Sequence, residues 1–368
     1  MKEPLDYKAS GVDYGQVDPL KLSAQRAALE TGVHLAVHGF SEVAASRGES
    51  AYVVDAGEFY LASLTECLGT KALLADAMRP ITGRTHYDDL AQDTVAMAVN
   101  DVVTVGATPI AVHAYWAAGG SDWFADLERA GDLVRGWRAA CDSCRVSWGG
   151  GETPALSGVV TPGAIDLAAS CVGVVRPKSR LTLGERLAPG DAIVLLASSG
   201  LHANGVSLAR KLADRLPRGL ATSLPDGRPY GEALLVPTTL YPPVTEAIYA
   251  AGVVPHYAAN VTGHGWRKLM RHSGAFTYRI RTVPPVPPVL RFVQAEAGID
   301  DREAYGTFNM GAGFALYVRA ADCETVIGAA RAKGIEAWIA GAVEPGERRV
   351  VIEPLGIEYR ASDLNVRA

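Results

Sequence analysis

An apolar run that stops at a group of charged residues divides this sequence into two halves. Residues 165–175 have the character of one long buried strand, and the charged segment 176–180 ends it before a new apolar strand begins at Ala192. The chain has 368 residues, which is more than the roughly 250 to 300 at which one hydrophobic core stops growing. The sequence therefore predicts two domains, residues 1–176 and 177–368.

Apolar runs with strand and helix character alternate on both sides of this break. In the first half, residues 51–54 and 110–116 have strand character, and residues 123–141 have the spacing of an amphipathic helix. The second half is expected to form helices at 206–216, 242–251 and 321–333 and strands at 192–197, 314–318, 337–341 and 349–352. Mixed elements of this kind predict an α+β fold of α/β type.

Composition limits the partners and the compartment of the chain. A formal net charge of -5 supplies no basic field for a polyanion, so nucleic-acid binding is not expected. No segment reaches the roughly 18 apolar residues of a membrane span, and residues 1–8 are charged where a secretory signal would be apolar. We therefore expect a cytoplasmic protein without membrane contact. Its five cysteines should be reduced thiols, with Cys141 and Cys144 buried rather than forming a redox or zinc motif.

Three consecutive glycines followed by a carboxylate are the first candidate for chemistry. Glycines at 149–151 permit positive φ angles and let backbone amides approach a phosphate, and Glu152 stands beside them where it could reach a metal ion. The same pattern is typical of a tight turn between a strand and a helix with a solvated glutamate. Gly150, Gly151 and Glu152 are therefore candidates for a nucleotide site, with the turn as the alternative.

Further acidic residues follow short apolar stretches. Glu66 and Asp101 each stand where a strand or helix is expected to end, and Asp93 precedes Asp101 by just over two helical turns, so both could face the same side. Mg²⁺ prefers hard oxygen ligands and keeps several waters, so two or three carboxylates and nucleotide phosphates would complete its shell. The alternative is that Asp93 and Asp101 cap or flank a helix.

A glycine-containing loop directly after the strand expected at 192–197 contributes His202 and Asn204. Loops in this position of α/β structures often contact ligands, and the alternative is an ordinary surface or packing histidine. Loops 260–266 and 306–313 have a similar composition and could also be tight turns. The sequence has no GxxxxGK[ST] phosphate loop, no GxGxxG dinucleotide fingerprint after a strand, no GxSxG and no HExxH. Familiar nucleotide folds and simple hydrolases are therefore disfavoured.

Taken in order, these motifs resemble the aminoimidazole ribonucleotide synthetase family, also called phosphoribosylformylglycinamidine cyclo-ligase. The resemblance spans nearly the whole chain. It rests on the segments Tyr7–Asp13, Gly69–Lys71, Asp93–Asp101, Gly150–Thr153, Ser198–Gly205 and Thr307–Gly311. Several motifs in a fixed order make this a specific signal.

The resemblance implies a fold and a reaction. Members of the family have two domains, an N-terminal β-rich domain that pairs into a barrel across a homodimer and a C-terminal α/β sandwich domain. Their reaction uses ATP to phosphorylate the amide oxygen of formylglycinamidine ribonucleotide, after which an internal nitrogen closes the imidazole ring and phosphate leaves. The implied ligands of this chain are thus ATP, Mg²⁺ and a small ribonucleotide.

The same resemblance implies roles for individual residues. Mg²⁺ would be held by Glu66, Asp101 and Glu152. Catalytic roles fall to Asp101, Glu152, His202 and Asn204, of which His202 and Asn204 would steady substrate or phosphate oxygens. Contacts with ATP fall to Lys8, Asp13, Thr70, Lys71, Asp93, Gly150 and Gly151, with Lys8 and Asp13 in a tail that closes over the nucleotide.

Three departures from the family pattern fall inside these motifs. Glu66 stands where the family commonly has Asp followed by Gly, residues 154–158 replace a stretch that usually carries a second acidic residue, and His264 interrupts a run of glycines. A divergent synthetase fits these changes. So does a related ATP-dependent kinase or phosphoryl-transfer enzyme with another acceptor, or a nucleotide-binding protein without turnover.

Overall fold

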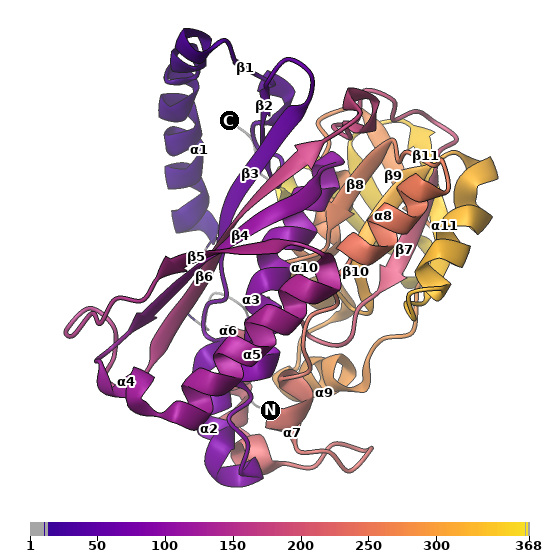
Figure 1. Cartoon of the computed structure of the whole chain (residues 1–368). Coiled ribbons are helices and arrows are strands. Elements are labelled where there is room, and N and C mark those ends of the chain that lie inside the picture. Colours follow the sequence, from indigo (N-terminus) through magenta and orange to yellow (C-terminus); the bar gives the residue numbers. More distant parts are fainter. Residues whose placement is uncertain (1–10, 12–13, 365, 367–368) are drawn as a thin grey trace.

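The first half of the chain builds one sheet and the second half builds another (Figure 1). The computed structural model describes Gly11, residues 14–364 and Val366. The first sheet has six strands, in the spatial order β1 (Ser41–Glu42), β2 (Tyr52–Asp55), β3 (Tyr60–Cys67), β6 (Ile165–Val175), β4 (Thr108–Ala118) and β5 (Ser147–Glu152). Only the β4–β5 pair is parallel within it.

Helices cover one face of the first sheet. They are α2 (Lys71–Thr82), α3 (Tyr87–Val102), α4 (Asp122–Ala125) and α5 (Leu127–Cys144). Leu167 and Cys171 of β6 are fully buried on the side where α3 packs, whereas Asp166 points the other way and is exposed. The opposite face, which we call the outer face, exposes Ile110 and Tyr115 of β4, at 44% and 38%.

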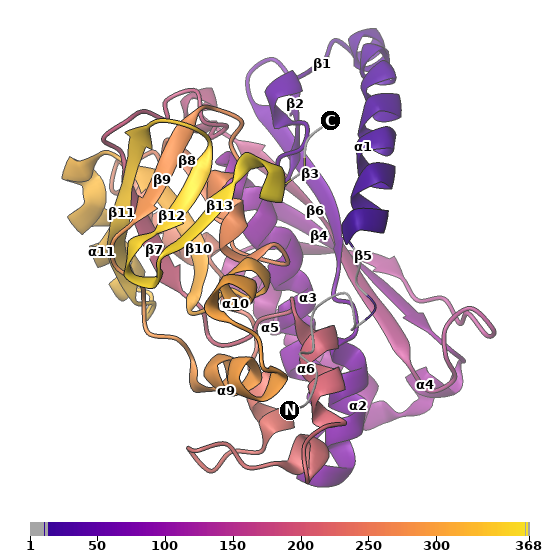
Figure 2. The ribbon, with the colours of Figure 1, turned by 180° about the vertical axis from the view of Figure 1, so that it is seen from behind.

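The second sheet has seven strands and helices on both faces. Its spatial order is β13 (Ile357–Arg360), β12 (Arg349–Ile352), β9 (Phe276–Ile280), β11 (Ala337–Pro345), β7 (Ala192–Ala197), β10 (Ala312–Val318) and β8 (Tyr257–Asn260). Figures 1 and 2 show α8 (Pro242–Ala250) and α11 (Cys323–Arg331) on one face and α10 (Asp301–Thr307) on the other. The remaining helices are α1 (Tyr14–Glu30), α6 (Val206–Ala213), α7 (Tyr230–Leu234) and α9 (Pro288–Ala297).

Several predicted elements are confirmed. The strands expected at 165–175 and 192–197 are β6 and β7 with the same bounds, and the helices expected at 206–216 and 242–251 correspond to α6 and α8. The α+β class is confirmed too, with two separate sheets. The chain passes from the first sheet to the second between Val175 and Ala192.

The triple glycine does not form the tight turn that was the alternative interpretation, because these residues lie inside strand β5. Glycine is needed here because β5 approaches β4 closely at an irregularity in the pairing. A Cβ on Gly151 would lie 2.0 Å from the carbonyl oxygen of Ala114, and one on Gly149 would lie 2.5 Å from Nε2 of His113. The glycines therefore have a packing reason that does not depend on a ligand.

Polar side chains of α3 hold the second half of the chain against the first. Asn100 donates from Nδ2 to the carbonyl oxygen of Thr239 (2.8 Å) and accepts from the backbone N–H of Tyr241 (2.9 Å). Just over two helical turns before it, Gln92 donates to the carbonyl oxygen of Thr238 (2.9 Å). Because these bonds are buried or partly buried, they fix the two halves around a common cavity.

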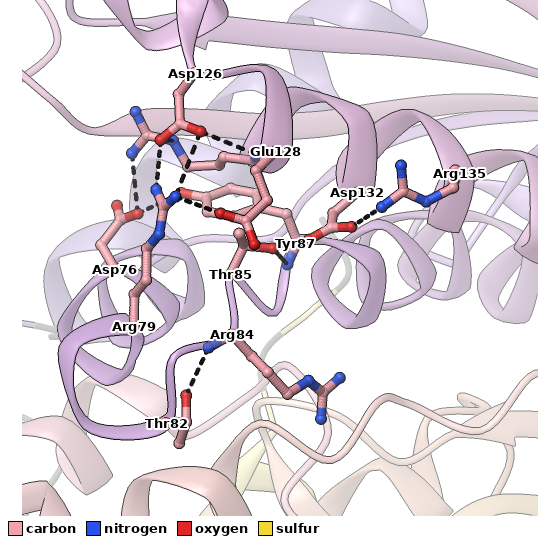
Figure 3. A network of polar contacts seen from close by, with 11 residues as sticks. Asp76, Arg79, Thr82, Arg84, Thr85, Tyr87, Asp126, Glu128, Asp132 and Arg135 are labelled. Atoms are coloured by element: carbon pink, nitrogen blue, oxygen red, sulfur yellow. Dashed lines mark hydrogen bonds and ion pairs between the residues drawn. The ribbon is translucent and has the colours of Figure 1, made fainter.

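A second polar cluster joins α2, α3 and α5 far from that cavity (Figure 3). Arg79 of α2 donates to Asp126, the residue that caps the first turn of α5, and to Glu128 (2.8 Å). Arg129 and the hydroxyl of Tyr87 both donate to Oδ1 of Asp76, at 3.2 and 3.0 Å. We call these six residues the α2–α5 network.

The structure also bears on two expectations from composition. All five cysteines are free thiols; Cys67 is exposed, and the other four, Cys141 and Cys144 among them, are buried. In the described part of the chain, no helix combines the length and the apolar character that a membrane crossing requires.

Candidate active site

A cavity of about 310 Å³ opens between α1 and the junction of the two sheets. Both halves of the chain and α1 contribute to its lining. The charged or polar side chains among the lining residues are Asp18, Lys21, Gln25, Glu49, Ser50, Glu66, Asp101, Asn204, Thr262, His264, Lys268 and Arg271. Figures 1 and 2 show α1 standing beside β1 to β3. Asp18, Lys21 and Gln25 of this helix line the cavity.

Two carboxylates meet in this cavity. Glu66 lies near the end of β3, and Asp101 lies in the last turn of α3, where Asn260 donates to its Oδ1 (2.7 Å). Burial, and next the charge of Asp101, raise the pKa of Glu66 to about 7. Within the described residues, the side chain of Glu66 has no hydrogen bond or ion pair. This carboxylate is thus held in a partly buried place without a cation bonded to it.

Three cations line the same cavity. Arg271 donates from Nε and Nη2 to the carbonyl oxygen of Gly48 (3.1 and 2.8 Å), and Lys268 donates from Nζ to Oγ1 of Thr262 (2.5 Å). Burial, and next the neighbouring Arg271, lower the pKa of Lys268 to about 8. Lys21 projects from α1 and is 57% exposed. Acidic and basic groups therefore line one cavity, as phosphoryl transfer requires.

The donor set fits Mg²⁺ bound together with a phosphate ligand. Mg²⁺ is usually held by one or two carboxylates, several waters and substrate phosphates. Glu66 and Asp101 supply two such carboxylates, and Glu66 has no other partner in the described chain. The described residues contain no group of three or more His, Cys, Asp or Glu side chains that would hold a metal without such a ligand.

The structure brings together three of the residues that the sequence singled out. Glu66, Asp101 and Asn204 all line the cavity, and so does His264, one of the three departures from the family pattern. Burial, and next Lys268, lower the pKa of His264 to about 2, so its imidazole is neutral. Asp93, which was expected to share a side with Asp101, does not line this cavity.

Lys71 and Asp93 face each other instead. Nζ of Lys71 lies 2.7 Å from Oδ2 of Asp93, and both side chains are 0% exposed. Asp93 also accepts from the backbone N–H of Thr238 (2.9 Å), and Lys71 donates to the carbonyl oxygen of Val236 (3.1 Å). In this structure both side chains are occupied in joining α2, α3 and the 236–239 segment.

His202 and Thr70 also lie outside the cavity. The backbone N–H of Ser199 donates to Nε2 of His202 (3.1 Å), and burial lowers the pKa of His202 to about 3. Thr70 shares a hydrogen bond of 3.0 Å with Ser207 and lines a separate hollow of about 500 Å³ together with Arg210. The sequence therefore groups residues that the fold places in several separate parts of the molecule.

The glycine strand lies at the edge of the first sheet. Glu66, Ala169, Ala114 and Gly151 form one row across β3, β6, β4 and β5, so three strand spacings, about 14 Å, separate Glu66 from Gly151. Gly150, Gly151 and Glu152 are exposed there. Lys8 and Asp13 lie outside the described residues.

Residues that the sequence reasoning missed lie on the second-half side of the cavity and on α1. Lys268 belongs to the 3₁₀ helix Gly265–Met270, where Arg267 and Lys268 are neighbours, and only the packing shows which of them enters the cavity. The available signal is the loop 260–266, which leads into this cluster of cations and whose composition is similar to that of the loop with His202 and Asn204, with a tight turn as the alternative.

Comparison with known families covers both halves of the chain. The pattern described as "AIR synthase related protein, N-terminal domain" matches residues 48–175, and the pattern described as "AIR synthase related protein, C-terminal domain" matches residues 188–353. A phosphoribosylformylglycinamidine cyclo-ligase of Lachnospira eligens is 33% identical over 95% of this chain and 100% of its own length. One from Symbiobacterium thermophilum is 39% identical over 79% of this chain and 82% of its own.

Solved structures resemble this fold at low sequence identity. AaThiL, in a complex with AMPPCP and TMP, has a TM-score of 0.58 at 14% identity and covers 85% of this chain and 90% of its own. Phosphoribosylformylglycinamidine synthase II from Thermotoga maritima has a TM-score of 0.56 at 17% identity, with 87% of this chain and 47% of its own covered. These likenesses bear on the fold alone.

Proposed function

The chain belongs to the AIR synthase related family in both of its domains, and from this membership we infer that it closes the imidazole ring of aminoimidazole ribonucleotide at the expense of ATP. The observation that carries the inference is the match to cyclo-ligases along nearly their whole length. The cavity supports it, because acidic and basic side chains suited to a metal and a phosphate line one space. The step belongs to purine biosynthesis.

The reaction consists of two balanced steps. The amide oxygen of formylglycinamidine ribonucleotide attacks the γ-phosphorus of ATP, and the bond from that phosphorus to the bridging oxygen breaks, with its electron pair leaving on ADP. An internal nitrogen then attacks the activated carbon, the C–O bond breaks, and phosphate departs with the former amide oxygen. The amide nitrogen loses its proton when its oxygen is phosphorylated, and the attacking nitrogen loses its proton on ring closure. A proton then moves from the ring methylene carbon to the exocyclic imine nitrogen, which makes the ring aromatic.

We propose that Glu66 and Asp101 hold Mg²⁺ against the phosphates of ATP. Bound Mg²⁺ would neutralise charge on the β- and γ-phosphates. Asn260 keeps Asp101 oriented by its 2.7 Å hydrogen bond, and Asn204, which also lines the cavity, offers an amide to a substrate oxygen. The neutral imidazole of His264 adds no charge to this space. A metal-binding role for Glu152 stays a prediction.

We also propose that the protein is a homodimer that joins through the outer face of the first sheet. This face exposes Ile110 and Tyr115, and exposed apolar side chains on a sheet favour association. Light scattering should give the mass of two chains, and Ile110→Asp should shift it toward one. The cytoplasmic location stays a prediction from the sequence.

A coupled assay of ADP release tests the proposed function. With Mg²⁺, ATP and formylglycinamidine ribonucleotide, we expect ADP release that depends on the ribonucleotide, together with an aminoimidazole product. The protein should also restore growth of a purine auxotroph that lacks this step. ADP release that does not respond to the ribonucleotide would contradict the proposal.

The same assay tests the acidic residues one by one. Glu66→Gln and Asp101→Asn should each lower turnover strongly. Glu152→Gln is the informative comparison, because Glu152 is exposed at the sheet edge, away from the cavity. Unchanged turnover in that variant would remove Glu152 from the site.

A further inference from the structure

The three cations that line the cavity differ in how much of their hydrogen-bonding capacity the protein already uses. Arg271 is occupied by the loop before β2, with two bonds to the carbonyl oxygen of Gly48 and one from Nη1 to Oγ of Ser50 (3.0 Å). Lys21 is largely exposed and lies 3.9 Å from Asp18. Neither is a buried cation with donors to spare.

Lys268 differs from Arg271 and Lys21 because it is buried and also has unused hydrogen-bond donors. It is only 8% exposed, and the single hydrogen bond of its side chain within the described residues goes to Thr262. An ammonium group has three N–H donors, so two remain without a partner in the described chain. A buried charge with unmet donors is unfavourable, so this one is suited to an anionic ligand.

The position of Lys268 relative to the carboxylates narrows the choice of ligand. Glu66 and Asp101 act on Lys268 electrostatically, yet neither forms an ion pair with it within 4 Å in the described chain. The fold therefore sets a cation and two carboxylates around one space without joining them. A phosphate that contacts carboxylate-bound Mg²⁺ on one side and the ammonium on the other would give both the carboxylates and the lysine a partner.

We propose that Lys268 is a catalytic residue that binds the phosphoryl group during its transfer from ATP to the amide oxygen. This inference rests on the proposed function. The ammonium donates to a non-bridging oxygen of the γ-phosphate while the bond to the oxygen of ADP breaks and the bond to the amide oxygen forms. Lys268 keeps its proton throughout and serves as a fixed positive charge.

The lysine is well suited to that role. It belongs to the 3₁₀ helix Gly265–Met270, in which Trp266 and Leu269 are fully buried, and Thr262 holds its ammonium before the nucleotide arrives. A prepositioned charge needs no rearrangement when negative charge develops. With a pKa of about 8, the group is cationic at neutral pH.

Nucleotide binding separates this role from a structural one, and it needs no turnover. Calorimetry should compare Mg·AMPPNP, which keeps a γ-phosphate, with Mg·ADP, which has none. Lys268→Met should weaken Mg·AMPPNP binding about tenfold or more, since a hydrogen bond to a charged group is lost, and should leave Mg·ADP binding nearly unchanged. Lys268→Arg should recover part of the lost affinity, because it restores the charge with a different shape.

The matched control is Lys333→Met, which removes an exposed lysine just beyond α11. It should bind both nucleotides as the unaltered protein does. Methionine fills most of the volume of Lys268 and removes a buried charge, so the fold should persist, and thermal unfolding checks this directly. In the ADP-release assay, Lys268→Met should lower kcat about 100- to 1,000-fold, with little change in KM for the ribonucleotide.

Two results would overturn the assignment. One is an equal loss of Mg·AMPPNP and Mg·ADP affinity in Lys268→Met, which would indicate a general effect on the cavity. The other is a raised KM for the ribonucleotide with kcat and Mg·AMPPNP binding unchanged, which would place Lys268 at the 5′-phosphate of the substrate. If the unaltered protein binds Mg·AMPPNP but gives no ribonucleotide-dependent ADP, the proposed function fails while the binding comparison still decides the role of Lys268.

Discussion

The cavity and the α2–α5 network contain the same kinds of charged side chain but use them differently. In the network, Arg79 contacts Asp126 and Glu128, and Arg129 contacts Asp76, so its carboxylates all meet a cation (Figure 3). In the cavity, Glu66 meets none within the described chain. The same type of side chain is thus paired with a cation in the network and left without one at Glu66, because the fold places the residues differently.

This difference separates charges that hold the fold from charges that await a ligand. The charges of an ion pair that is complete within the protein already compensate each other, so they contribute little to binding a nucleotide. An unpaired carboxylate and a lysine with spare donors are unfavourable until a ligand of the right charges binds between them. By this criterion the buried Lys71–Asp93 pair belongs with the network, although the sequence grouped both residues with the ATP site.

The largest effect should follow from breaking that buried pair. Lys71→Met leaves Asp93 fully buried without its cation, so the free energy of unfolding should fall by about 3–5 kcal/mol, measured by urea denaturation. The double variant Lys71→Met with Asp93→Asn should recover part of the loss, because the amide oxygen can still accept from Thr238. A loss below about 1 kcal/mol in the single variant would contradict a structural role for the pair.

Removing a charge from the cavity should affect turnover rather than stability. Asp101→Asn keeps an oxygen that can accept the hydrogen bond from Asn260, so the fold should be retained. Turnover should fall about 100- to 1,000-fold, because a group proposed to hold the metal is lost. The rate of ADP release and the unfolding curve should be measured on the same protein. A variant that loses stability and activity together would place Asp101 with the structural charges.

Acidification should test His202, which the structure buries as a neutral side chain. Its pKa is lowered to about 3 by burial, so below the unfolded value near 6.5 the unfolded chain binds a proton that the folded one does not. Stability from this residue is complete above that value and falls as pH drops, by about 1.4 kcal/mol for each unit down toward pH 3. Urea unfolding at pH 7.5 and pH 5.0 measures the slope.

The matched variant is His202→Asn. His202 has a positive φ of 65°, a backbone region that asparagine tolerates better than most residues, so the loop should keep its shape. The loss of stability between pH 7.5 and 5.0 should become smaller in this variant. His38→Asn, at an exposed histidine, should leave the slope as it is. An identical slope in all three proteins would show that His202 does not carry the acid sensitivity.

The elements that the sequence predicted well are those whose pattern is local. The apolar runs at 165–175 and 192–197 predict buried strands whatever elements pack against them. Their bounds agree with β6 and β7. The strand at the triple glycine could not be predicted, because the need for glycine there arises from a contact between two strands and not from the neighbouring sequence. A Cβ on Gly151 would lie only 2.0 Å from the carbonyl oxygen of Ala114, and that contact is decided by the pairing of β5 with β4.

The candidate site was only partly predictable for the same reason. Glu66 and Asp101 could be selected because each follows an apolar stretch in a motif of the family. Asp93 and Asp101 lie on one helix, but a separation of eight residues turns them about 80° apart, enough for different partners. Lys268 could not be selected, because nothing in the run Trp266-Arg267-Lys268 shows which cation the packing turns inward.

The smallest loss of stability should come from removing a charge in the α2–α5 network. Asp126→Asn removes the negative charge that Arg79 contacts but keeps an oxygen that can cap the backbone N–H of Arg129 (3.1 Å). Because both charged groups are partly exposed, at 34% and 26%, stability should fall by only about 0.2–1 kcal/mol. Asp126→Ala also removes the cap and should cost about 1 kcal/mol more. Turnover should be unchanged in both variants, and a fall in ADP release comparable to that of Asp101→Asn would show that the network and the cavity are not separate regions after all.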